Sequence, residues 1–215
     1  MFSALKAIVD LIRSGLSDFR KIRDGRKRKE IVLGLLRAYF LLKGCVDDGE
    51  KLLEIAGIDP TSKIRDMESG EAVKTIEEWD AILRRQGHRL YVLQGLIFGQ
   101  DHIAVINPDL QCKIGTIVGY KMDRAVTLHG IGAALFFRNM FPQQETQEDK
   151  ARLISMMLGA EDNGALNLEA SAVEIGALRR ALDEYRSVVE RFVSNEEILL
   201  LSEKARQFAE RVAMA

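Results

Sequence analysis

The chain has 215 residues, 47% hydrophobic and 29% charged, a composition that excludes an intrinsically disordered protein and suits one folded domain. It contains only three prolines, which favours long helices over a turn-rich β fold. The formal net charge of −1 excludes a strong overall attraction to nucleic acid or to an anionic membrane. We therefore expect a single soluble all-α domain, a bundle of about six or seven helices.

The charges are unevenly distributed along the chain. Residues 1–30 hold nine Lys and Arg against four Asp and Glu, whereas residues 143–215 hold nine against fourteen. Segments of opposite charge can attract each other within one molecule or between two copies, although two separately solvated surfaces are the alternative. Within the one domain, 1–215, we expect an amphipathic N-terminal helix with a basic end (1–25), core helices (26–141) and acidic C-terminal helices (143–215).

The two cysteines, Cys45 and Cys112, have no paired spacing. This pattern fits a reducing cytosol, excludes a cysteine-rich zinc site, and favours two small core residues. The N-terminus lacks the order of charged and apolar residues that defines a signal peptide. No uncharged apolar run is long enough to span a bilayer, so we expect a cytoplasmic protein with no transmembrane segment.

The first two helices are predicted from apolar residues at helical spacing. Residues 2–22 carry an apolar stripe that is typical of packing on a core, with a membrane-surface anchor as the alternative because a basic run follows. Gly25 is expected to break the chain before a second helix over 27–56. The first half of this helix is apolar nearly all round, which predicts a central position, and Gly57 can end it.

A long antiparallel helical hairpin is predicted in the middle of the chain. Ser69 can cap a helix over 70–106, and Asn107-Pro108 supplies the cap and start of another over 108–139. Gly95-x-x-x-Gly99 and Gly115-x-x-x-Gly119 lie at mirrored positions about Asn107, so we expect the two arms to pack closely there. Leucine at Gly95 or Gly119 should then lower the thermal stability. Because 102–122 is rich in β-branched residues, a short β-hairpin and an α+β fold are the alternative.

Three further helices are predicted in the acidic C-terminal part. The first starts at Thr146-x-x-Asp149, which resembles a capping box, and ends near Gly159. The second covers 168–193, with Asn167 as its cap. The last begins at the capping box Ser194-x-x-Glu197.

Two pairs of carboxylates offer a candidate metal site. Asp47 and Glu50 are three residues apart on the second helix, as are Glu77 and Asp80 on the third, and an antiparallel pairing would bring the four together around Mg²⁺. The arrangement resembles the ExxE…ExxD pattern of the all-α nucleotide pyrophosphohydrolases of the MazG-like and dUTPase-like type. The resemblance implies Mg²⁺-assisted hydrolysis of a nucleoside triphosphate with these four residues as ligands. A solvated helix face is the alternative.

A second resemblance concerns Arg124-Ala-Val-Thr-Leu-His129. This sequence is similar to the R-x4-H spacing of the HEPN-type ribonucleases, which are also helical bundles. The resemblance implies that Arg124 and His129 would act on the 2′-hydroxyl and the scissile phosphate of RNA. In an unbroken helix, however, positions five apart point about 140° away from each other.

Two basic clusters are candidate binding sites for a phosphate-containing ligand, a nucleic acid or an acidic partner. They are Arg26, Lys27, Arg28 and Lys29 at the start of the second helix, and Arg84, Arg85, His88 and Arg89 on the third. The sequence contains no P-loop, no GxGxxG, no nucleophile elbow and no HExxH motif. We therefore expect a non-catalytic binding or scaffolding protein without a cofactor, acting through helix faces on a protein partner or as a homo-oligomer. A Mg²⁺-dependent enzyme and a ribonuclease are the alternatives.

Overall fold

The computed structural model describes residues 2–15, 24–57, 66–98 and 168–214, together with Ile64 and His129. Within these residues the chain forms five α-helices, one short 3-10 helix and no strand, which confirms the all-α class for that part. The predicted helix 146–159, the alternative β-hairpin at 102–122 and, apart from His129, the predicted hairpin arm 108–139 lie outside the described residues.

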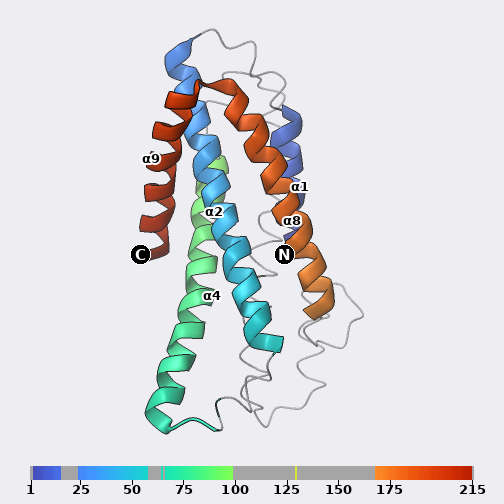
Figure 1. Ribbon diagram of the computed structural model, residues 1–215, viewed down its shortest axis with the longest axis vertical. Helices are drawn as coiled ribbons and strands as arrows, with labels where there is room; N and C mark the ends of the chain where they lie inside the picture. The colour runs from blue at the N-terminus through green and yellow to red at the C-terminus, as the bar shows by residue number, and fades with distance from the viewer. Residues whose placement is uncertain are drawn as a thin grey trace.

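Helix α2 (Gly25–Gly57) lies at the centre, and the other helices are arranged around it (Figure 1). It packs against α4 (Ser69–Phe98), α8 (Leu168–Val189) and α9 (Asn195–Met214), whereas α1 (Phe2–Gly15) packs against α8. The 3-10 helix η2 (Glu190–Phe192) connects α8 to α9, which also contacts α4. The predicted central position of the second helix is thus confirmed, as is its end at Gly57.

Tyr185 of α8 is the largest fully buried side chain of the core. Its hydroxyl donates a hydrogen bond to the carbonyl of Leu35 at 3.0 Å, and its ring stacks on that of Tyr39 with 6.4 Å between centroids. Burial raises the pKa of Tyr185, because the phenolate would lose its hydration. These contacts attach α8 to the first half of α2.

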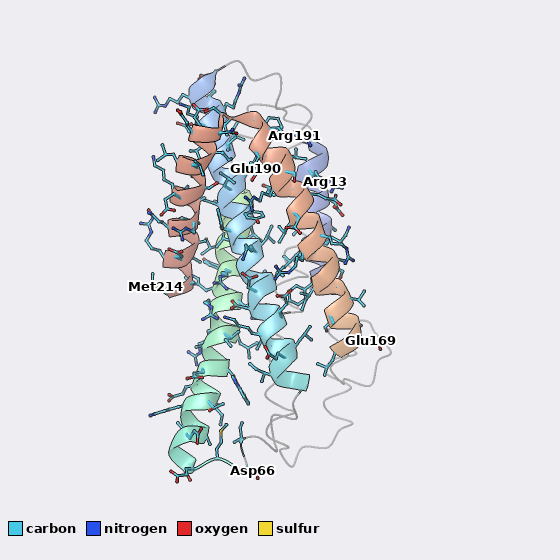
Figure 2. The ribbon with its side chains drawn as sticks, viewed as in Figure 1. Arg13, Asp66, Glu169, Glu190, Arg191 and Met214 are labelled. Carbon is cyan, nitrogen blue, oxygen red and sulfur yellow. The ribbon has the colours of Figure 1, made fainter. Side chains whose placement is uncertain are left out.

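The apolar stripe of α1 faces the interior. Phe2, Leu5, Ile8 and Val9 are buried in the common core, so the described part of the stripe is covered by protein, as the core interpretation predicts. To bind a membrane surface, this part of the stripe would have to leave the core. Arg13 lies where α1 runs beside α8, and it pairs with Glu184 (Figure 2). Among the described helices, none combines the length and the apolar character that a membrane-spanning helix needs.

Helix α2 begins at Gly25 itself and is capped by Asp24, a residue that the sequence patterns did not identify. The Asp24 carboxylate accepts hydrogen bonds from the backbone nitrogens of Arg26 at 2.9 Å and Lys27 at 3.3 Å. A run of cations is unfavourable at the positive end of a helix. The acidic cap offsets part of this repulsion.

The junction before α9 contains the predicted capping box. The backbone nitrogen of Glu197 donates to Ser194 Oγ at 3.3 Å, and the backbone nitrogen of Ser194 donates to Glu197 Oε2 at 3.3 Å. Replacing Ser194 by alanine is expected to lower the free energy of unfolding by about 1 kcal/mol, measured by urea denaturation. Ser202→Ala, inside α9, is the control, and an equal loss in both variants would show that the cap contributes nothing.

Candidate functional site

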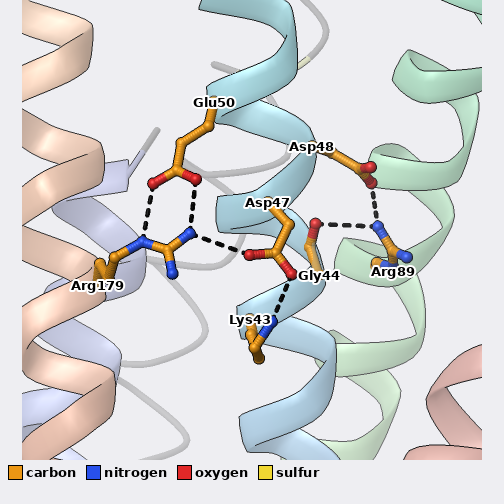
Figure 3. A network of polar contacts seen from close by, with 7 residues as sticks. All are labelled: Lys43, Gly44, Asp47, Asp48, Glu50, Arg89 and Arg179. Carbon is orange, nitrogen blue, oxygen red and sulfur yellow. Dashed lines mark hydrogen bonds and ion pairs between the residues drawn. The ribbon is translucent and has the colours of Figure 1, made fainter.

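Asp47 and Glu50 on α2 both bind Arg179 of α8 (Figure 3). The guanidinium Nη2 lies 3.0 Å from Asp47 Oδ1 and 2.6 Å from Glu50 Oε2, and Lys43 Nζ lies 2.7 Å from the other Asp47 oxygen. The hydrogen bond to Glu50 is the main cause that raises the pKa of Arg179. All these side chains remain partly exposed, so the network connects α2 to α8 at the surface.

The second carboxylate pair lies apart from the first. Asp80 forms an ion pair with Arg84 one turn further along α4, and Glu77 is exposed to solvent. Among the described residues, which include all four carboxylates, no group of three or more His, Cys, Asp or Glu side chains is placed to hold a metal ion. The predicted convergence of Asp47, Glu50, Glu77 and Asp80 is therefore wrong, because the α2 pair faces α8 instead of α4.

The buried carboxylate of α2 is Asp48, which the sequence motifs left out. Its side chain is almost fully buried and accepts hydrogen bonds from Arg85 Nη2 at 2.7 Å and Nε at 3.3 Å. Arg89 also binds Asp48, and it donates to the carbonyl of Gly44 at 3.0 Å. Next to this triad, Gln86 Nε2 donates to the carbonyl of Cys45 at 2.9 Å. Hydrogen bonds and ion pairs between polar side chains thus connect α4 to α2 inside the bundle.

This triad changes the interpretation of the basic cluster on α4. Arg85 and Arg89 point inward to Asp48, Arg84 pairs with Asp80, and His88 is half-buried. Three of the four predicted phosphate-binding side chains therefore have carboxylate partners within the protein. The spacing could have revealed Asp48, because it follows Leu41 and Cys45 on the apolar face of α2 at helical intervals.

The basic run at the start of α2 is also partly neutralised. Arg26 Nε lies 3.2 Å from Glu30, and Lys29 Nζ lies 2.7 Å from Glu197 at the start of α9. Lys27, in the same first turn of α2, is exposed, and Arg28 is partly buried. The Lys29–Glu197 pair joins the basic N-terminal part to the acidic C-terminal part within one molecule.

His129 lies against α4, at the level of the basic cluster, as the predicted hairpin requires. Its imidazole Nε2 is 3.1 Å from the position that a Cβ atom at Gly87 would occupy. Burial is the main cause that lowers the pKa of His129, and a hydrogen bond to the backbone of Leu83 opposes it. Arg124 lies outside the described residues, so the pairing that the ribonuclease resemblance implies stays a prediction.

The cysteine prediction holds for the described residue of the two. Cys45 is fully buried on α2, and burial raises the pKa of its thiol to about 12. A thiol with that pKa is a poor nucleophile at neutral pH. Cys45 is thus a core residue, and Cys112 lies outside the described part of the chain.

A shallow apolar groove lies between the C-terminal part of α4 and α9. It has a volume of about 440 Å³ and is lined by Tyr91, Val92, Gln94, Gly95, Leu96 and Phe208. Tyr91 is 72% exposed at its edge. Among the described residues, no atom lies within 4 Å of where a Cβ atom at Gly95 would be. Within the described structure Gly95 therefore opens onto this groove. Its predicted close contact with the second arm of the hairpin stays a prediction, because Gly99, Gly115 and Gly119 are outside the described residues.

Comparisons with protein-family models, with curated proteins and with solved structures found no match.

Proposed function

We propose that this protein is a non-catalytic binding or scaffolding protein that contacts a protein partner through a helix face. The observation that carries the proposal is Tyr91, exposed beside the apolar groove between α4 and α9. Exposed apolar patches next to polar surface are typical of protein–protein contacts, and tyrosine is enriched at their centres. The groove is open to solvent, which suits a helix face better than a small molecule.

The other candidate groups support the same proposal. Asp47, Glu50, Arg85 and Arg89 are bound to partners on neighbouring helices, where they stabilise the bundle. These internal contacts explain why the four charged side chains are present, so a bound substrate is not needed to explain them. A second copy of the chain is the alternative partner, although the pairing of Lys29 with Glu197 already satisfies some of the charge that would drive self-association.

The proposal is tested by placing a photo-crosslinking amino acid at position 91 and irradiating the full-length protein in an extract of the cells that express it. We expect one reproducible protein adduct that is absent when the crosslinker stands at position 173, where Val173 is exposed on α8. Tryptophan at Gly95 should fill the groove and abolish the adduct. The same change at Gly70, which also faces open space but lies at the other end of α4, should leave it intact.

Sedimentation velocity over a range of protein concentrations completes this test, because it shows whether the partner is a second copy. A concentration-dependent dimer that disappears in Gly95→Trp and persists in Gly70→Trp identifies self-association through the groove. If position 91 gives no specific adduct and the protein sediments as a monomer throughout, the proposed binding role of this groove is refuted.

A further inference from the structure

The walls of the groove limit what can occupy it. One side is the outer face of α4 around Tyr91 and Gly95, and the other is Phe208 of α9. The lining is mainly apolar, the volume is about 440 Å³, and the groove is shallow. These are the features of a surface that accepts the apolar stripe of an amphipathic helix, whose side chains recur at i, i+3, i+4 and i+7.

The charges beside the groove are cationic. The Arg37 guanidinium carbon lies 4.8 Å from the centre of the Phe208 ring, and the Nε atom of Arg37 is buried without a hydrogen-bond partner in the described structure. Lys204 and Arg211 are four residues before and three residues after Phe208, so they flank its ring on the same side of α9. Both are exposed, and the described residues supply neither with a carboxylate partner.

The described acidic residues of α4 and α9 do not pair with these cations. The last 18 residues of α4, Ala81–Phe98, contain no Asp or Glu. On α9, Glu203 and Glu210 both pair with Arg206. Each directly precedes one of the two cations in the sequence, so it points about 100° away from that cation around α9. The apolar groove therefore has an edge with cations that lack a carboxylate partner among the described residues.

We propose that the groove binds an acidic amphipathic helix of a partner protein, with apolar residues in the groove and Asp or Glu against Arg37, Lys204 and Arg211. This inference rests on the proposed function and names the chemistry of the partner. Apolar burial supplies most of the affinity, and the charges select an acidic helix over a basic one. Each exposed ion pair contributes little to the free energy of binding. Three pairs together should make the acidic helix bind about tenfold more tightly than a basic one at low salt.

The test uses two synthetic helical peptides with the same leucine stripe, one with glutamate and the other with lysine at the flanking positions. Each carries a fluorophore and is titrated with the full-length protein while the anisotropy is measured. We expect the glutamate peptide to bind about tenfold more tightly, and the difference to shrink as salt is added. Gly95→Trp should abolish the binding, and Gly70→Trp should not.

Charge reversal separates this inference from the proposed function. In Lys204→Glu with Arg211→Glu, the preference should invert in favour of the lysine peptide. The matched control is Lys51→Glu with Lys74→Glu, which makes the same change of charge at exposed sites on α2 and α4 and should alter nothing. Equal affinities for the two peptides, or an unchanged preference after reversal, overturn the acidic partner while a specific adduct at position 91 still supports the proposed function.

Two further outcomes also overturn the acidic partner. One is a failure of both peptides to bind. The other is a dimer in sedimentation velocity that Gly95→Trp abolishes, because the occupant of the groove is then a second copy of this chain.

Discussion

Replacing Asp48 by alanine is expected to lower the free energy of unfolding by about 3 to 5 kcal/mol. The carboxylate is 2% exposed and is the shared partner of Arg85 and Arg89, which point into the contact between α2 and α4. Its removal leaves two guanidinium groups beside a buried void without a counter-charge. Urea denaturation followed by circular dichroism measures the loss, which should appear as a lower midpoint with an unchanged slope.

The adjacent residue provides a matched control. Asp47 is one position earlier on α2, but its pair with Arg179 is partly exposed, so Asp47→Ala should cost less than about 1 kcal/mol. A second comparison replaces Asp48, Arg85 and Arg89 together by methionine. This triple variant should be more stable than Asp48→Ala alone, because no unpaired charge then remains in the interior. Equal losses for Asp47→Ala and Asp48→Ala would contradict the assignment of a buried charged triad.

The helices themselves were predictable because their signals are local. The apolar stripe of residues 2–9, the apolar run of α2 that starts at Ile31, and the Ser194 capping box each depend on residues within one or two turns. The predicted helix 168–193 ends as α8 at Val189 and continues as a 3-10 turn. Such differences at helix ends are small, since the last turn of a helix commonly tightens.

The polar contacts were harder to predict because they depend on how helices rotate against each other. Asp47 and Asp48 are neighbours in the sequence, yet one faces α8 and the other α4. Consecutive helical residues point 100° apart, so the choice between them decides which carboxylate is buried. A motif of residues three apart selected Asp47 with Glu50 and omitted Asp48. The apolar neighbours of Asp48 on the buried face were the signal that could have corrected it.

Glycine spacing had the same limitation. The sequence indicated Gly95 as a position of close approach but did not indicate Gly44 and Gly49 of α2, where the described structure has its closest approaches. A Cβ atom at Gly49 would collide with the ring of Phe2, where α1 meets α2. A single glycine opposite a large side chain produces no repeat, and so no sequence motif marks it.

Replacing Gly44 by alanine is therefore expected to lower the free energy of unfolding by about 2 to 4 kcal/mol. This loss lies between the usual cost of overpacking a core and the usual cost of breaking a buried ion pair. The new methyl group would lie 2.6 Å from the guanidinium carbon of Arg89. That guanidinium cannot move away freely, because it binds both Asp48 and the carbonyl of Gly44. Thermal and urea unfolding measure the loss.

Gly95→Ala gives the opposite expectation and serves as the control for Gly44→Ala. Both glycines lie inside helices, so alanine gains up to about 1 kcal/mol of helix propensity at either position. At Gly95 nothing in the described structure opposes this gain, and the variant should be as stable as the original protein or more stable. With Asp48→Ala as background, Gly44→Ala should cost less than it does alone, since the pair that it disturbs is already lost. An undiminished loss in that background would show that the methyl group clashes with the helix packing itself and not with the Arg89–Asp48 pair.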